Sequence, residues 1–206
     1  MKIQEVVDIA RYSELSSVSV KDDINAIVAF LNIGMTELYT RFPIKTKEYV
    51  VELVEGQSLY NLPDDFMYSL SAFIEPEENA ANDALVQIAI NDEGEEKSIY
   101  FPDWKTVQVP DDIISSFVSI VYVAKPIMIS ADNLEAEIEL PDTLVDALMS
   151  YIGYRAHLGV RSDTQSENNA QWQRFERNCE KVRELGVAYP IDTLTMSNRI
   201  SSRGFV

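Results

Sequence analysis

Apolar residues near both ends of the chain recur at steps of three and four, the spacing of helices that bury one face. This pattern predicts helices over residues 1–12, 22–42, 141–161 and 166–185. We expect the third to be the helix on which the other long helices pack. The predicted core-facing residues are Ile3, Val6, Val7 and Ala10; Ile24, Ile27, Val28, Leu31, Met35, Leu38 and Phe42; Leu144, Val145, Leu148, Tyr151, Ile152 and Ala156; and Trp172, Phe175, Cys179 and Val182.

Local signals mark the ends of these helices. Asp22 or Asp23 is a suitable N-cap for the second helix, and Pro43 ends it. Pro141 suits a first helical turn, where its missing N–H is no loss. Gly186 is placed to end the last helix. Gly34 lies in mid-helix, where glycine costs about 1 kcal/mol, and this predicts close packing at that position.

The middle of the chain has a different pattern. After Ile44, short β-branched and aromatic runs alternate with turn-like segments, which is typical of strands. We expect a small antiparallel sheet or barrel of about five to seven strands. After the β-branched run that opens at residue 47, the candidate strands are Tyr68–Ile74, Leu85–Ile90, Ser98–Phe101, Thr106–Val109 and Ile113–Ala124.

The order of elements predicts an α+β fold: a bundle of long helices with an inserted antiparallel β domain and an extended C-terminal arm. Residues 1–43 with 141–186 would form the helical domain, 44–140 the inserted domain, and 187–206 the arm. The arm shows no regular period, so we do not expect it to pack a core of its own.

Charge divides the chain in the same way. The 206 residues carry 34 acids and 17 bases, a net charge of −17, which argues against an ordinary phosphate-binding surface. DNA can still pass nearby without being bound. Residues 45–140 alone hold twenty acids and five bases. This excess of acids has two possible explanations. Acidic turns keep a sheet soluble, or the acids form a surface that repels polyanions or binds a basic partner.

Few residues are available for metal or cofactor chemistry. The chain has one cysteine and one histidine, so a disulfide within the chain and a site with several histidine or thiolate ligands are excluded. Glycine-rich phosphate loops and nucleophile-elbow, zincin and kinase signatures are absent. We therefore expect no enzyme activity, no cofactor and no metal. No signal peptide or membrane span is evident, and we expect a soluble chain made in a reducing cytoplasm.

Four features have both a chemical and a structural interpretation. Asp64 with Asp65 is a carboxylate pair for metal or acid–base work, or a turn after Pro63. The acidic run over residues 92–96 faintly resembles a calcium loop, but it fits a solvated hairpin tip better. His157 suits a helix C-terminus or an interface more than catalysis. Cys179 lies on an apolar stripe, which predicts a buried, inert thiol.

The last predicted helix carries a cluster of bases among acids. Pairing within the helix with Glu176, Glu180 and Glu184 is one explanation. A face that forms salt bridges between subunits is the other. The candidate subunit-interface residues are Arg174, Arg177, Lys181 and Arg183.

Three stretches carry a family resemblance. INAIVAFLNIGMTELYTRFPI, residues 24–44, leads from a helix into a strand. EGQSLYNLPDDFM, residues 55–67, has a G-x-x-x-Y-x-L-P-x-D-F pattern. ELPDTLVDALMSYIGYRAH, residues 139–157, returns to a helix. Together they resemble the head-to-tail adaptor (connector) proteins of short-tailed phages, the group that includes tail tubular protein A. The patterns cover about a third of the chain.

The resemblance implies a structural virion protein of the head–tail junction, made in the host cytoplasm. Such adaptors form a homo-oligomeric ring, usually of twelve copies, below the portal protein. The ring extends the DNA channel, through which DNA passes without specific binding, and it is the platform for the tail or nozzle protein. The C-terminal segment commonly docks on the portal, and here the candidate anchors are Ile191, Leu194, Met196, Ile200 and Phe205.

Three alternatives remain open from the sequence. A tail-completion or gatekeeper protein would retain DNA. An acidic DNA mimic would be a monomer that binds a basic enzyme. A hydrolase would use Asp64 or Asp65, would depend on a metal, and would lose activity in Asp64→Ala.

Overall fold

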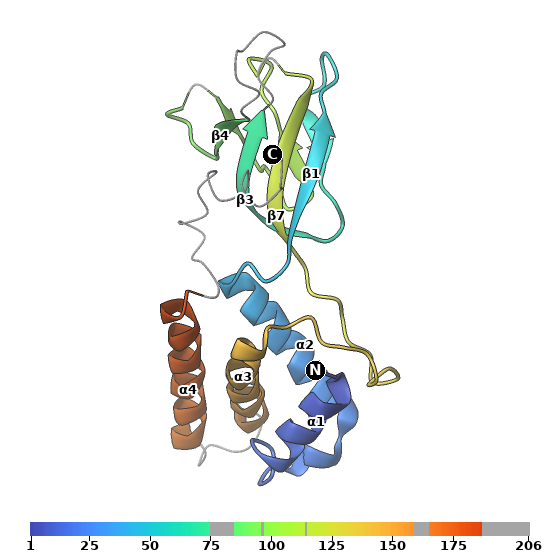
Figure 1. Ribbon diagram of the computed structural model, residues 1–206, viewed down its shortest axis with the longest axis vertical. Coiled ribbons are helices and arrows are strands. Elements are labelled where there is room, and N and C mark those ends of the chain that lie inside the picture. Colours follow the sequence, from blue (N-terminus) through green and yellow to red (C-terminus); the bar gives the residue numbers. More distant parts are fainter. Residues whose placement is uncertain (75–84, 96, 114, 159–164, 187–206) are drawn as a thin grey trace, which may run out of the picture. The chain divides into compact units, whose positions relative to one another are not determined.

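The computed structural model describes residues 1–74, 85–95, 97–113, 115–158 and 165–186, and they form an α+β fold with helices and a mostly antiparallel sheet. The fold divides into two compact units (Figure 1). The helical unit contains Met1–Ile44 and the described residues after Lys125, and the β unit is Lys45–Lys125. The predicted arm, residues 187–206, lies outside the described residues.

The helical unit contains α1 (Ile3–Tyr12), α2 (Ile24–Arg41), α3 (Val145–Leu158) and α4 (Gln165–Glu184). Short 3₁₀ turns precede α2 and α3: η1 (Ser19–Asp22) and η2 (Asp142–Leu144). The predicted face of α1 is confirmed, because Ile3, Val6, Val7 and Ala10 are all buried. Three of the four predicted core residues of α4 are also buried, namely Phe175, Cys179 and Val182.

The predicted boundaries of α2 agree with the structure. The Asp23 carboxylate accepts a hydrogen bond from the Ala26 N–H at 3.1 Å, so Asp23 rather than Asp22 is the N-cap. The helix ends at Arg41, with Phe42 as its C-cap before Pro43. Gly34 lies against α3: a Cβ at this position would be 2.7 Å from Leu148 Cδ1 and 3.2 Å from Tyr151 Cδ1. The predicted close packing at Gly34 is therefore confirmed.

Helix α3 is buried on more sides than a one-faced helix would be. The predicted residues Leu148, Tyr151, Ile152 and Ala156 are buried, while Val145 is half-buried. Met149, Ser150, Gly153 and His157 are buried as well. The helix packs against α4 and α2, and to a lesser extent against α1, which explains this burial. The expectation that the other helices pack on this one is met for the described residues.

Residues 126–140, which we call the return segment, pack with the helices. The Ile3 and Gln4 N–H groups donate to the Ala136 and Leu134 carbonyls at 2.9 and 2.8 Å. Tyr39 Oη donates to the Glu139 carbonyl at 2.7 Å. We predicted that this segment belongs to the inserted domain, whereas it lies in the helical unit.

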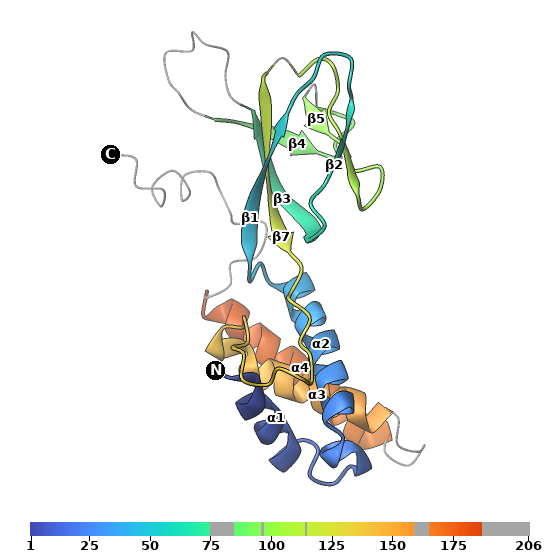
Figure 2. The ribbon, with the colours of Figure 1, turned by 90° about the vertical axis from the view of Figure 1, so that its right-hand side faces the viewer.

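The β unit contains two sheets (Figure 2). The larger has the order β1-β7-β3-β4-β5, and the smaller pairs β2 with β6. A shared core between them includes Val51, Ile88, Ile99, Val107 and Ile120. The strand bounds are β1 (Thr46–Glu52), β2 (Leu59–Asn61), β3 (Phe66–Ile74), β4 (Val86–Ile90), β5 (Ser98–Ile99), β6 (Thr106–Gln108) and β7 (Phe117–Ala124).

The strands differ from prediction in several places, and β2 was not among the candidate strands. β3 begins at Phe66 rather than Tyr68, across register shifts in its pairing with β7. β7 begins at Phe117 rather than Ile113, and Ile113 instead contributes a buried side chain to the core. The pairing of β4 with β5 is parallel, so the predicted antiparallel sheet is mostly rather than wholly antiparallel. A short parallel bridge of two residues leaves no periodic signal in a sequence.

Candidate functional site

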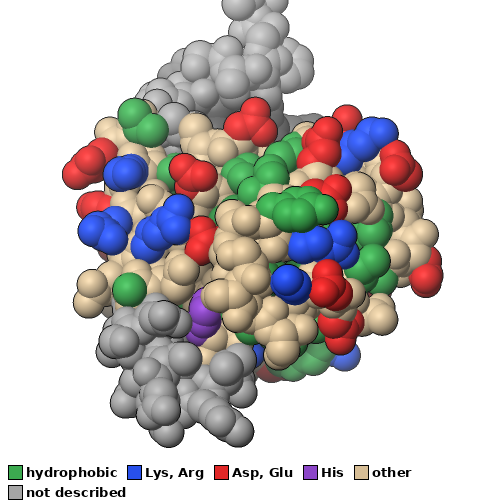
Figure 3. Space-filling model, turned by 90° about the horizontal axis from the view of Figure 1, so that it is seen from below, with side chains coloured by type: hydrophobic (Ala, Val, Ile, Leu, Met, Phe, Trp, Pro, Cys, Tyr) green, Lys and Arg blue, Asp and Glu red, His purple; other side chains and the backbone are tan. Residues whose placement is uncertain are grey.

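Of the four basic residues predicted as a cluster on α4, two form ion pairs with described residues and two do not. Arg174 forms an ion pair with Glu14 at 2.7 Å, and Arg183 pairs with Glu180 at 3.1 Å and lies over the Phe42 ring. Arg177 and Lys181 are exposed and make no ion pair with any described residue. Viewed from below, basic side chains gather among acidic ones on the flank of α4 (Figure 3). Two of the four candidate interface residues, Arg174 and Arg183, therefore already form ion pairs within the chain.

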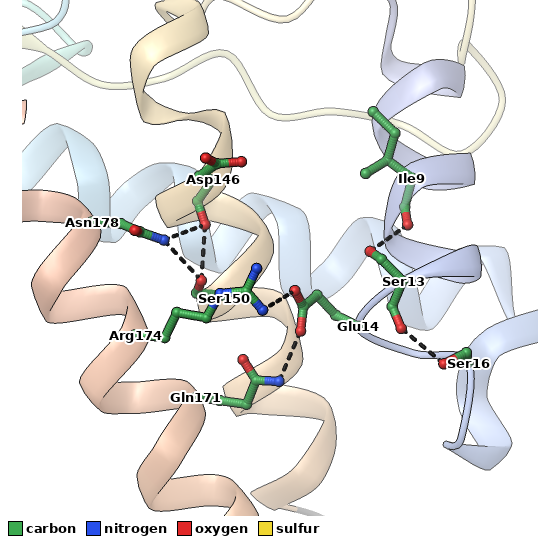
Figure 4. A network of polar contacts seen from close by, with 9 residues as sticks. All are labelled: Ile9, Ser13, Glu14, Ser16, Asp146, Ser150, Gln171, Arg174 and Asn178. Carbon is green, nitrogen blue, oxygen red and sulfur yellow. Dashed lines mark hydrogen bonds and ion pairs between the residues drawn. The ribbon is translucent and has the colours of Figure 1, made fainter.

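Glu14 joins the segment after α1 to α4 (Figure 4). Its carboxylate accepts hydrogen bonds from Gln171 Nε2 at 2.8 Å and from Arg174 Nη1 at 2.7 Å, and only 8% of its side chain is exposed. Gly153 makes room for it, since a Cβ there would be 3.3 Å from Glu14 Cβ. A carboxylate this buried requires its cationic partner, so Arg174 has a structural role.

A second polar contact fixes α4 against α3. Asn178 Nδ2 donates to the Asp146 carbonyl at 3.1 Å and contacts Ser150 Oγ at 3.2 Å. Ser150 Oγ donates to the same carbonyl at 2.9 Å (Figure 4). These bonds fix the register of the two helices along their contact.

Arg41, at the end of α2, is the most highly connected cation of the helical unit. Its guanidinium donates to Glu37 at 2.7 Å and to both carboxylate oxygens of Glu176 at 2.9 and 3.0 Å. It also lies 5.5 Å from the centroid of Trp172 and 4.7 Å from that of Phe175. Partial burial alone would lower the pKa of Arg41, but the two carboxylates raise it. Arg41 thus stays charged and ties α2 to α4.

The predictions for Cys179 and His157 can be compared with their surroundings. Cys179 is fully buried, and burial raises the pKa of its thiol to about 11. The predicted burial of Cys179 is confirmed, and the raised pKa favours the protonated thiol. His157 lies in the last turn of α3 with 8% of its surface exposed. Its predicted place near a helix C-terminus is confirmed.

The carboxylates Asp64 and Asp65 have structural partners. Asp65 accepts hydrogen bonds from Lys47 Nζ at 2.5 Å and Tyr122 Oη at 2.9 Å. The Lys47 hydrogen bond is the main cause that lowers the pKa of Asp65. Asp64 accepts from Lys125 Nζ through its main-chain carbonyl at 3.0 Å. Both lie in a turn between β2 and β3, which favours the turn interpretation.

The acidic run that begins at Asp92 also fits a turn. Asp92 accepts a hydrogen bond from the Gly94 N–H at 2.9 Å, as turn-forming aspartates do. Among the described residues, no three His, Cys, Asp or Glu side chains are grouped as a metal ion would require. In the same part of the chain, no helix has the length and apolar character needed to cross a membrane.

Two parts of the site were not predicted. Arg41 and Glu14 contact residues 135 to 160 positions away, so no local pattern reveals them. The sequence does contain one local signal for Arg41: it lies four residues after Glu37 at a helix end, the spacing of an ion pair on one helix face. The return segment could have been found from the alternation of Leu134, Ala136, Ile138 and Leu140 with acids. The predicted portal-binding residues lie outside the described residues.

The three stretches that carry the family resemblance fall on described elements of both units. The first forms α2 and leads into β1, the second forms β2 and the turn into β3, and the third forms η2 and α3. This order of a helical unit interrupted by a β unit agrees with the fold that the resemblance implies. The chain belongs to the SU10 adaptor protein family, whose model matches residues 1–193. It is thus a virion component. No curated protein shows significant similarity to the chain.

Proposed function

We propose that this adaptor forms a ring, usually of twelve copies, below the portal protein, and that the ring extends the DNA channel and carries the tail. Family membership supports the adaptor role. The observation that carries the ring is the pair of exposed bases Arg177 and Lys181, which have no ion-pair partner among the described residues. Exposed charges on a well-packed helix are available to a neighbouring subunit. The protein acts by binding, without catalysis or a cofactor.

The attachment to the portal is assigned to residues 187–206. Their apolar side chains Ile191, Leu194, Met196, Ile200 and Phe205 would be the anchors. Deleting residues 190–206 should abolish portal docking and leave the helical circular dichroism unchanged. Loss of that signal would show that the segment is needed for folding and would count against an arm.

The acidic β unit would keep DNA mobile in the channel. Residues 45–125 hold sixteen acids and five bases, a net charge of −11. Carboxylates repel the phosphate backbone, so a lumen lined with them would not retain the genome during ejection. A density map of the ring with these acids on its exterior, away from the lumen, would refute this role.

The decisive experiment is light scattering after size-exclusion chromatography, on the protein alone and mixed with the portal ring. We expect a portal-sized complex with about one adaptor per portal subunit. A free monomer alone is compatible with the proposal, since the portal can template assembly. Absence of association at every salt concentration would contradict the proposal. It would favour an acidic DNA mimic, for which the net charge of the β unit is the supporting observation.

A further inference from the structure

The outer face of α4 carries a stripe of three exposed side chains. Arg177, Lys181 and Leu185 are spaced four residues apart and so lie on one side of the helix. Leu185 is 66% exposed, and its N–H still bonds to the Lys181 carbonyl at 3.1 Å, which continues the helical turn. The stripe spans roughly 12 Å along the helix axis. It combines two cations with an apolar side chain at its end.

The opposite flank of the helical unit has the complementary chemistry. Figure 1 shows the return segment on the side of the helical unit away from α4. There Ile127 and Met128 are 66% and 69% exposed beside a groove of about 260 Å³, which is also lined by Ile3, Met35, Ile129 and Ile138. The exposed acids of this segment are Asp132, Glu135, Glu137 and Glu139.

The acids of the return segment are only partly neutralised. Residues 126–140 hold four acids and no base. Lys2 forms an ion pair with Glu135 at 2.7 Å, but both side chains are mostly exposed, and such pairs contribute little. The groove therefore has an apolar floor and a negative rim.

We propose that the α4 stripe of one copy docks in the return-segment groove of a second copy. Leu185 would enter the groove beside Ile127 and Met128, while Arg177 and Lys181 would face Glu135 and Glu137 of the second copy. The charges are of opposite sign on the two surfaces, and each surface exposes apolar side chains. This inference rests on the proposed ring and names the contact between its subunits.

The placement of the two surfaces sets the symmetry of the contact. They are different patches on opposite flanks of one compact unit. A contact between different patches is heterologous, and repeating it generates a closed ring or a filament rather than a twofold dimer. This is the kind of contact that a ring around a channel requires.

Cysteine cross-linking between copies tests the contact. One chain carries Leu185→Cys and another carries Met128→Cys, and Cys179 does not compete because it is buried. Under mild oxidation, alone and with the portal ring, we expect disulfide-linked dimers only when the two variants are mixed. The matched control mixes Leu185→Cys with Val54→Cys, which is 56% exposed in the β unit, and should give none.

Charge reversal provides a second readout that does not depend on cross-linking geometry. Arg177→Glu with Lys181→Glu, or Glu135→Lys with Glu137→Lys, should each weaken assembly at least tenfold while circular dichroism stays unchanged. Mixing the two reversed variants should restore assembly, because each then meets its opposite charge.

The outcomes separate this contact from the proposed function. Assembly that shows no cross-link between residues 185 and 128, and that is insensitive to both reversals, would overturn this contact and leave the adaptor role intact. Absence of any assembly with the portal would overturn both.

Discussion

The helical unit and the β unit use charge in opposite ways. Ion pairs such as Arg41 with Glu176 and Arg174 with Glu14 connect distant parts of the helical unit, whereas in the β unit Lys47 pairs with Asp65. In the helical unit, charges such as Arg41 and Glu14 connect different helices. In the β unit, sixteen acids face only five bases, and most of the acids in its described part are exposed.

This difference shows that a net charge says little about where charges contribute to stability. Partly buried pairs hold helices in position, and removing one partner is costly. Solvated acids mainly set the field around the molecule and are screened by salt. Substitutions should therefore have large local effects in the helical unit and small, salt-dependent effects in the β unit.

One tryptophan lies in each unit, Trp172 in α4 and Trp104 between β5 and β6. Replacing either with Phe leaves the fluorescence of the other as a reporter of one unit. Unfolding of the two units can thus be followed separately, which each measurement below requires.

The largest effect is expected at the contact of α2 with α3. Gly34→Val places a branched side chain where a single Cβ would already be 2.7 Å from Leu148. Overpacking of this kind should destabilise the helical unit by about 1–3 kcal/mol, measured by urea unfolding with Trp172 fluorescence. Ala29→Val, at an exposed position of the same helix, is the control and should cost about 0.5 kcal/mol. Equal losses in the two variants would contradict the close approach.

The next effect concerns Arg41. Arg41→Gln removes the bonds to Glu37 and Glu176 and the contact with two aromatic rings. Because the site is only partly buried, we expect a loss of about 1–2 kcal/mol. Arg177→Gln removes the same charge from the exposed face of α4 and should stay within about 0.5 kcal/mol. If thermal denaturation gives both variants the same midpoint, Arg41 does not tie the helices together.

A smaller, pH-dependent effect is expected for the ion pair of Lys47 with Asp65 in the β unit. Since the pKa of Asp65 is lowered from 3.8 by Lys47, its stabilisation is present above that value and is lost as the pH falls through the lower folded pKa. Asp65→Asn should lower the midpoint at pH 7 by about 2 °C. The difference from the unmodified chain should disappear once the pH falls below the lowered folded pKa of Asp65. A difference that persists in acid would exclude this charge as its cause.

The smallest effect is expected from the solvated acids. Glu52→Gln with Glu55→Gln should change the stability of the β unit by less than about 0.5 kcal/mol. Any gain in the stability of the β unit should come from reduced repulsion between its carboxylates and should vanish in high salt. Urea unfolding with Trp104 fluorescence at low and high salt measures it. A marked loss of stability at both salt levels would mean that these acids have partners in the fold.

The sequence predicted what depends on neighbours in the chain. The cap at Asp23, the close approach at Gly34 and the end of α4 at Gly186, whose φ is +64°, follow from local chemistry. The α+β order followed from two different periodicities. These signals act over a few residues, and tertiary structure did not overrule them.

Features that depend on distant residues were missed. The contacts of Arg41 with Glu176 and of Glu14 with Arg174 join residues far apart in the chain. The return segment bonds to the first residues of the chain, more than 100 positions away, and it was assigned to the inserted domain. The basic cluster on α4 was predicted, but the sequence did not indicate which of its residues form ion pairs within the chain.

The β unit begins and ends at one point of its own sheet, because the Ala124 N–H bonds to the Lys45 carbonyl at 2.9 Å. A module that starts and finishes side by side can be enlarged, trimmed or exchanged while the chain around it keeps the same path. Evolution can then vary the module independently of the helices, and an engineer could replace residues 46–124 with a short turn. Different phages could thus modify one part of such an adaptor while retaining the other.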